Sequence, residues 1–250
     1  MNMNTLPENQ EKYNLLAQIE LHFKTNLGLT ACVGAEMEFY LSEEMDIALL
    51  EEFVGYSIKT EKGNNQYEID LEPSCDLVEY AKLIESVRNK VIQGAIKLGC
   101  KADFSSKPYA DDYGNSMHIH LNFLEEWDID KFAQILCHHL PAGLPIFLPH
   151  KDDWQRLDKD FMAPTHICYG GNNRTVAIRI PDAEPKRLEH RVSAASSDPA
   201  LVIYEILDSI ARGIAAPEDM SVYSKIYGNA FDPQYKLRKI ASGKSSVMAV

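Results

Sequence analysis

Positive charge is scarce in this sequence of 250 residues, which carries 25 Lys and Arg against 37 Asp and Glu, a net charge of −12. This balance argues against a nucleic-acid backbone or an anionic membrane surface as a partner, but not against metal ions. No uninterrupted apolar run approaches membrane-spanning length, and the N-terminus lacks a basic region followed by an apolar one. We therefore expect a cytoplasmic protein with neither a nucleic-acid nor a membrane partner.

Cysteine is also sparse. The five cysteines, Cys32, Cys75, Cys100, Cys137 and Cys168, are widely spaced and form no Cys-x-x-Cys pair. This spacing indicates neither a disulfide framework nor a zinc knuckle. We expect reduced, mostly buried thiols, with Cys32 and Cys168 in the core.

The chain contains no internal repeat and no linker, so we predict a single domain over residues 1–250, with unstructured ends at 1–9 and 241–250. Apolar periodicity and capping residues predict helices over residues 10–26, 43–53, 76–98, 128–140 and 198–212, and a weaker helix within 217–240. Ser42 is the expected cap of the second helix, Pro141 ends the fourth, and Gly213 ends the fifth. We predict strands over residues 34–41, 56–60, 66–71, 101–104, 117–122, 165–169, 174–181 and 186–193.

The stretch from Gly34 to Leu41 is an apolar strand pattern interrupted by two carboxylates, Glu36 and Glu38. Successive strand side chains point to opposite faces, so these two share one face, about 6 to 7 Å apart. On a half-buried sheet they repel each other, and desolvation adds to the cost unless cations lie beside them. A divalent metal would remove that cost.

Four later strand patterns also have one polar face, and lysine is absent from all five polar rows. The rows contain Gln66, Glu68, Asp70 and Glu72; His118, His120 and Asn122; Thr175 and Arg179; and Arg187, Glu189 and Arg191. For Glu36 and Glu38 alone, a solvated face is the better interpretation. With the other four rows counted, a metal and nucleotide site becomes the better interpretation, because carboxylate, imidazole and guanidinium groups together are typical of such a site.

These segments resemble, in the same order, the catalytic-domain motifs of glutamine synthetase. The matching stretches are GAEMEF (34–39), QYEI (66–69), SMHIH (116–120), NRTVAIRIP (173–181) and RLEHR (187–191). Five motifs in order are far more specific than any one of them. The resemblance covers roughly residues 31–213. It implies an α+β fold in which a curved antiparallel sheet lines a channel, with helices packed on its outer face.

The resemblance also implies that ATP and Mg²⁺ or Mn²⁺ bind in the channel. By position, Glu38, Glu61 and Glu68 are the expected ligands of the metal on the acyl-acceptor side, although Glu61 lies one residue closer to Glu68 than in the family pattern. The expected ligands of the metal that bridges the ATP phosphates are Glu36, His118 and Glu189. Hard oxygen ligands with one imidazole suit Mg²⁺ or Mn²⁺.

Matches to the family assign the remaining polar residues to the nucleotide and the substrate. The expected ATP-binding residues are His120, Asn122, Arg179 and Arg187. Arg156 and Arg191 match the clamp on the substrate carboxylate, with Gly114 and Tyr113 beside them. Arg174 matches a phosphate-contacting arginine and, with Arg156 and Arg191, forms the expected catalytic set; guanidinium binds both carboxylate and phosphate in two-pronged fashion.

Three departures from the family pattern affect the acceptor side. The family's flap carries a glutamate that helps to take a proton from ammonium, two residues before the proline that is Pro164 here. Met162 stands at that position in this chain. Tyr113 replaces an asparagine that helps to bind the amino group of glutamate. Only one helix precedes the first motif, so we expect the family's small N-terminal domain to be absent.

The predicted function is that of an ATP- and divalent-metal-dependent carboxylate-amine ligase. It would activate a glutamate-like side-chain carboxylate as an acyl phosphate for attack by ammonia or another amine. Two alternatives stay open: a catalytically silent regulator that binds ATP and metal, and a phosphotransferase. The partners would be a small amino acid and an amine, and a homo-oligomer is possible. The sequence leaves the acid, the amine, the metal and the oligomeric state open.

Overall fold

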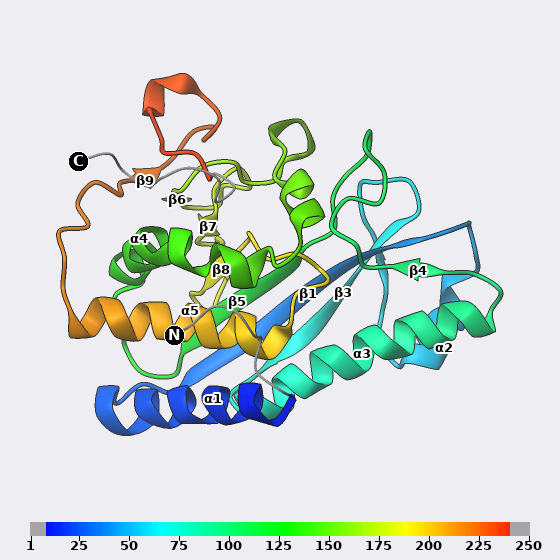
Figure 1. The fold of residues 1–250 in the computed structure, drawn as a ribbon, viewed down its shortest axis with the longest axis horizontal. Coiled ribbons are helices and arrows are strands. Elements are labelled where there is room, and N and C mark those ends of the chain that lie inside the picture. The colour runs from blue at the N-terminus through cyan, green and yellow to red at the C-terminus, as the bar shows by residue number, and fades with distance from the viewer. Residues whose placement is uncertain (1–8, 241–250) are drawn as a thin grey trace.

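The structure, a computed structural model, describes residues 9–240 (Figure 1). Most of both predicted unstructured ends lies outside this range, and Asn9 begins the first helix. The helices are α1 (Asn9–His22), α2 (Ile47–Val54), α3 (Leu77–Lys97), α4 (Ile129–Phe147) and α5 (Pro199–Ala215), with short turns η1 (Phe23–Leu27), η2 (Lys151–Arg156), η3 (Lys159–Phe161) and η4 (Pro233–Tyr235). None of the helices within this range is both long and apolar enough to cross a membrane.

The described residues form one sheet of nine strands, in the order β2-β3-β1-β5-β8-β7-β6-β9, with β4 paired to β1. The strands are β1 (Ala31–Leu41), β2 (Lys59–Thr60), β3 (Gln66–Ser74), β4 (Ala102–Asp103), β5 (Met117–Phe123), β6 (Tyr169–Gly170), β7 (Ile178–Arg179), β8 (Leu188–His190) and β9 (Lys225–Ile226). Neighbouring strands run antiparallel except that β6 is parallel to β7 and β9. The predicted α+β fold is confirmed: an open, mainly antiparallel sheet with its helices packed on the outer face.

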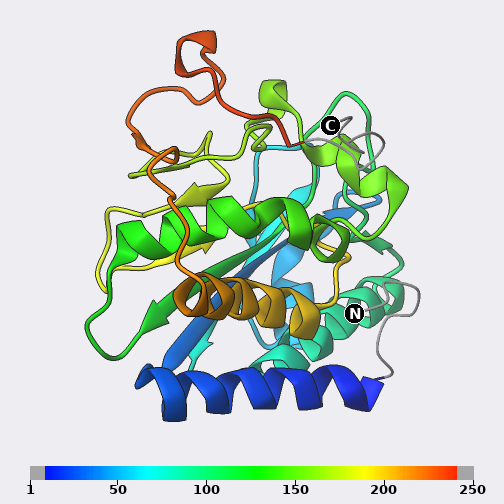
Figure 2. The same ribbon diagram turned by 60° about the vertical axis from the view of Figure 1, so that its left-hand side comes forward.

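The helices gather on one side of the sheet (Figures 1 and 2). On β1, Val33, Ala35, Met37 and Phe39 are buried in the core that the sheet forms with the helices. Because strand side chains alternate, Glu36 and neighbouring polar residues point to the opposite side. The helix-covered face therefore holds the core, and the other face remains free for a site.

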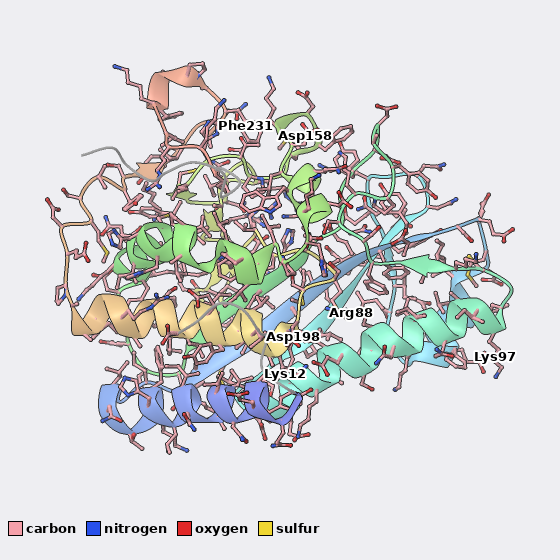
Figure 3. The ribbon with its side chains drawn as sticks, in the orientation of Figure 1. Lys12, Arg88, Lys97, Asp158, Asp198 and Phe231 are labelled. Atoms are coloured by element: carbon pink, nitrogen blue, oxygen red, sulfur yellow. A yellow bond between two sulfur atoms is a disulfide. The ribbon has the colours of Figure 1, made fainter. Side chains whose placement is uncertain are left out.

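A buried ammonium group joins three of the helices. Lys12 on α1 lies beside Asp198, the N-cap of α5 (Figure 3). Its Nζ donates to Glu85 Oε1 on α3 and to Asp198 Oδ2, both at 2.6 Å, and its side chain is 6% exposed. These pairs fix the helix layer behind the sheet.

Several predicted helix boundaries are wrong. The N-cap of α2 is Asp46, whose Oδ1 accepts from Ala48 N–H at 3.1 Å, and not Ser42. α4 continues through Pro141 to Phe147, because its buried apolar side chains hold the helix together despite the missing N–H. α5 continues through Gly213, whose small size permits close packing on Ile135; a Cβ at Gly213 would lie 2.5 Å from that side chain.

The segment predicted as a weak helix, 217–240, contains only β9 and the short turn η4. β6, β7 and β8 are also much shorter than the strands predicted there, because loops interrupt their pairing. These loops bring polar side chains to the free face of the sheet.

The prediction of five reduced thiols is wrong for one pair, since Cys32 and Cys75 form a disulfide across 43 residues. The register of β1 on β3 pairs Val33 with Ser74, which places the two neighbouring cysteines opposite each other. The other three cysteines are free and buried, as predicted for Cys168.

Candidate active site

The polar rows of the central strands come together through the register of the sheet. Glu36 on β1 pairs with Asp70 on β3 and with His118 on β5. Glu38 pairs with Glu68, and His120 pairs with Glu189 on β8. Residues from four strands therefore meet on the face that the helices leave free.

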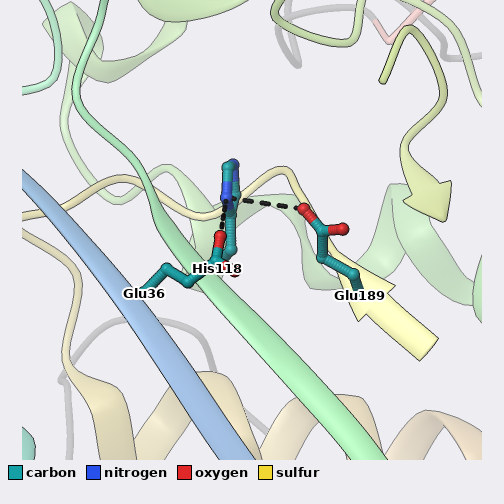
Figure 4. A group of neighbouring side chains, drawn as sticks. All are labelled: Glu36, His118 and Glu189. Atoms are coloured by element: carbon teal, nitrogen blue, oxygen red, sulfur yellow. Dashed lines mark hydrogen bonds and ion pairs between the residues drawn. The ribbon is translucent and has the colours of Figure 1, made fainter. Parts of the chain in front are cut away.

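The first candidate metal group consists of Glu36, His118 and Glu189 (Figure 4). Each offers one ligand atom, and these atoms lie within 4.8 Å of one another. His118 Nδ1 lies 3.0 Å from Glu36 Oε2 and 3.5 Å from Glu189 Oε1. His118 is 6% exposed and Glu189 is fully buried, so the group is largely shielded from solvent.

The second candidate metal group consists of Glu38, Glu68 and His118, with ligand atoms again within 4.8 Å. The backbone N–H and the hydroxyl of Ser116 both donate to Glu38 Oε2 at 2.7 Å. Ser116 was not predicted to have a role, although it lies in a matched motif. Glu61 lines the same cavity but is not a member of either group.

The electrostatics of these carboxylates fit a divalent cation. Burial and the charges of Glu36, Glu38 and Glu61 raise the pKa of Glu68 to about 10. Burial and the charge of Glu38 also raise the pKa of Glu61. Several closely spaced carboxyl groups cannot all ionise without a large free-energy cost. A divalent cation between them compensates for both burial and repulsion.

Glu36 behaves differently because imidazoles flank it. Burial acts to raise its pKa, but hydrogen bonds from His118 and His120 hold it well below the usual range. His120 Nε2 lies 2.9 Å from Glu36 Oε1, and Arg187 Nε donates to His120 Nδ1 at 3.2 Å. Since Nδ1 accepts, Nε2 carries the proton and donates to Glu36.

Two arginines face Glu189. Arg179 Nη1 donates to Glu189 Oε2 at 2.7 Å, and Arg191 Nη1 donates to Glu189 Oε1. Burial acts to raise the pKa of Glu189, but the charge of Arg191 lowers it below its ordinary value. The buried carboxylate therefore stays ionised and orients both guanidinium groups.

Arg156, an expected clamp on the substrate carboxylate, is largely engaged by the backbone. Its Nε donates to Asn115 O at 3.1 Å, and its Nη1 donates to Arg191 O at 3.3 Å and Val192 O at 2.7 Å. Burial lowers its pKa to about 10. Arg156 therefore ties the loop before β5 to the segment after β8, and Nη2 is the nitrogen left for a ligand.

Two adjoining cavities contain all the predicted site residues. The first, of about 240 Å³, is lined by both metal groups and by Glu61, Tyr113, Gly114, Arg156, Arg174, Arg179 and Arg191. The second, of about 550 Å³, is lined by His120, Asn122 and Arg187. Glu36 and Asp70 line both, so the two cavities meet at the first metal group. The roles given to these residues stay predictions.

The first cavity also contains residues that the sequence did not single out. Lys59, Lys62 and Phe161 line it together with Met162 and Ala163. Lys59 lies on β2, Lys62 follows that strand, and Phe161 ends η3, so no shared sequence pattern marks these residues.

The catalytic domain of glutamine synthetase is the family that matches this chain, over residues 51–242. Glu36 and Glu38 precede the matched part. The gamma-glutamylputrescine synthetase PuuA of Escherichia coli (strain K12) is 27% identical over 190 residues, covering 70% of this chain and 40% of that protein. The glutamate–methylamine ligase of Methyloversatilis universalis is 29% identical over 202 residues, covering 67% of this chain and 44% of that protein. The chain thus spans less than half the length of these two relatives.

Solved structures give the same fold. A GmaS/ADP complex superimposes with a TM-score of 0.76 at 22% identity, covering 92% of this chain and 65% of that one. GmaS without ligand gives a TM-score of 0.74 at 24% identity, covering 90% of this chain and 63% of that one.

Proposed function

Because this chain belongs to the glutamine synthetase family through its catalytic domain, we propose that it is an ATP- and divalent-metal-dependent carboxylate-amine ligase. The observation that carries the proposal is the convergence of Glu36, Glu38, Glu68, His118 and Glu189 on the first cavity, which the second cavity adjoins at Glu36. Relatives named for joining glutamate to methylamine and for making gamma-glutamylputrescine support the reaction class.

Glu36, His118 and Glu189 would hold one ion, and Glu38 and Glu68, with Glu61 beside them in the first cavity, a second. A bound Mg²⁺ or Mn²⁺ would neutralise phosphate charge during phosphoryl transfer. The second cavity would take the nucleoside part of ATP, with Arg187 and His120 at its inner end. The triphosphate would then point toward Arg179 and Arg174 in the first cavity.

In the proposed reaction, a carboxylate oxygen of the acid attacks the terminal phosphorus of ATP, and ADP leaves. The amine nitrogen then attacks the carbonyl carbon, and phosphate leaves with the electrons of the carbon–oxygen bond. Arg179 and Arg191, oriented by Glu189, would stabilise the negative charge that develops on the phosphoryl oxygens. Arg156 would keep the loops around this centre in place.

Incubation with ATP, Mg²⁺ or Mn²⁺, and a panel of amino acids and amines tests the proposal. We expect release of ADP and phosphate together with an amide identified by mass spectrometry. Glu38→Gln removes a proposed ligand and should abolish turnover, whereas Glu126→Gln, an exposed glutamate outside both cavities, should not. Absence of ADP release with every combination would defeat the proposal.

Met162 favours a second candidate, a regulator that binds ATP and metal without turnover. A thioether cannot take a proton from an incoming ammonium ion, and Met162 lines the cavity where the amine would enter. Tight nucleotide binding without ADP release would identify this function. A stable phosphorylated product in place of an amide would instead identify a phosphotransferase.

A further inference from the structure

One wall of the first cavity is apolar, although the rest of the lining is charged. Phe161 at the end of η3 and the next two residues, Met162 and Ala163, line it, and Tyr113 lines it from the loop before β5. The rings of Tyr113 and Phe161 pack edge to face, with centroids 5.3 Å apart. We call Tyr113, Phe161, Met162 and Ala163 the acceptor wall.

The backbone of the acceptor wall is held in a specific shape. Met162 has φ +59°, in the left-handed region, and its N–H donates to Lys159 O at 3.3 Å. A non-glycine residue adopts this conformation only where its surroundings enforce it. The Met162 side chain is thereby kept at the cavity, in the place where a proton acceptor would be useful.

Cations of the chain itself already lie over both aromatic rings of the wall. Lys107 Nζ is 3.6 Å from the centre of the Phe161 ring, and Lys62 Nζ is 5.9 Å from that of Tyr113. The Lys107 side chain is 4% exposed, and its nearest carboxylate oxygen, on Asp158, is 3.9 Å away. Among the described residues its ammonium group has no hydrogen-bond partner. A second positive charge brought to this wall would therefore be repelled.

The carboxylates of the cavity are committed elsewhere. Those of the two candidate metal groups surround His118, Glu61 is an expected ligand of the second ion in the same cavity, and Asp70 pairs with Lys59. Of the described residues that line this cavity, none offers a further carboxylate to a cationic substrate. The acceptor wall can therefore contribute dispersion and apolar contacts, but no negative charge to pair with a cation.

We propose that the acceptor substrate is a primary amine with a single amino group and an uncharged, apolar substituent that packs against the acceptor wall. This inference rests on the proposed function and deepens it by naming the class of amine. The overall reaction is carboxylate plus alkylammonium plus ATP, giving amide, ADP, phosphate and one proton. Phe161 and Met162 are then specificity-determining residues that contact the substituent.

Rates with matched amines test this assignment. At saturating ATP, Mg²⁺ and glutamate, kcat/KM is measured for ammonium, ethylamine, butylamine, 1,4-diaminobutane and β-alanine. Each buried methylene should raise kcat/KM on the order of threefold, so butylamine should exceed ethylamine by roughly tenfold. Butylamine should exceed diaminobutane by on the order of a hundredfold, because the second ammonium group adds a positive charge that the wall does not pair. Preference for ammonium, the diamine or the amino acid would overturn the inference.

Substitutions at Met162 test whether the acceptor wall determines the preference among amines. Met162→Glu places a carboxylate on the wall and should raise the relative use of ammonium and diaminobutane at the expense of butylamine, mainly through KM. Met162→Leu keeps an apolar side chain of similar size and should retain the wild-type order. An unchanged order in Met162→Glu would show that the wall does not contact the substituent.

A binding experiment separates this inference from the proposed function. Saturation-transfer NMR with butylamine is recorded on the full chain with Mg²⁺ and a non-hydrolysable ATP analogue. If no amine supports turnover, the ligase proposal fails. Transfer to the butyl group in wild type and Met162→Leu, but not in Met162→Glu, would still establish the apolar site, whereas no transfer in wild type would overturn it.

Discussion

Binding of a divalent ion should release a proton from Glu68. Burial and three neighbouring carboxylates raise its pKa to about 10, so in the metal-free protein the group is protonated at neutral pH. A metal ligand must be ionised, so the ion displaces that proton. The apparent affinity for Mn²⁺ should therefore rise tenfold per pH unit between pH 7 and 8.

The raised pKa of Glu68 also predicts how the stability of the metal-free protein depends on pH. The pKa of Glu68 is higher in the folded protein than in the unfolded chain, so this carboxyl group contributes stability that is fully present at a pH below its unfolded-state pKa. That contribution is lost as the pH rises toward 10. Because of Glu68, the free energy of unfolding of the metal-free protein should fall as the pH rises. Saturating Mn²⁺ should reverse this trend.

Calorimetry in buffers of different ionisation enthalpy, such as HEPES and Tris, counts the protons released per ion. We expect close to one proton at pH 8 for wild type, and close to none for Glu68→Gln, which should also bind more weakly. Glu126→Gln, exposed and outside both cavities, should match wild type. Binding without proton release, or equal release in Glu68→Gln, would refute the reasoning, because the carboxylates would then already be ionised.

Three further substitutions test the packing around the site, each by urea denaturation of the metal-free protein. Glu189→Gln leaves two buried guanidinium groups without their shared countercharge and should lower the free energy of unfolding by about 3 to 5 kcal/mol; a loss below about 1 kcal/mol would contradict the ion-pair geometry. Lys12→Met removes the buried ammonium group between two partly exposed carboxylates and should cost about 1 to 3 kcal/mol, and an unchanged midpoint would mean that this cluster does not fix the helix layer. Gly213→Ala should cost about 1 to 3 kcal/mol because its Cβ would lie 2.5 Å from an α4 side chain, and a neutral result would show that the helices separate easily.

The polar face of the sheet was the most predictable feature. The two-residue period of a strand decides which side chains share a face, so Glu36 with Glu38, and His118 with His120, could be placed together from the sequence. The structure brings these rows into register beside Glu189 of β8, which the resemblance had placed with Glu36 and His118. The order of strands in the sheet was not predicted, because alternation does not identify pairing partners.

Features that depend on long-range packing were missed. Cys32 and Cys75 bond because strand register sets them side by side, which no local spacing shows. Pro141 and Gly213 end helices in many sequences, but here the helix contacts outweigh that local preference. The contacts of Arg156 with backbone carbonyl groups also depend on the fold and were not predicted, whereas its role in binding substrate stays a prediction.

The most direct measurement of the central claim follows an ¹⁸O label placed in the side-chain carboxylate of glutamate during turnover with ATP, Mg²⁺ and butylamine. If side chains on the free face of the sheet activate that carboxylate as an acyl phosphate, one labelled oxygen will appear in each inorganic phosphate released. Phosphate without the label would mean that water, and not the carboxylate, receives the phosphoryl group, and would contradict the account.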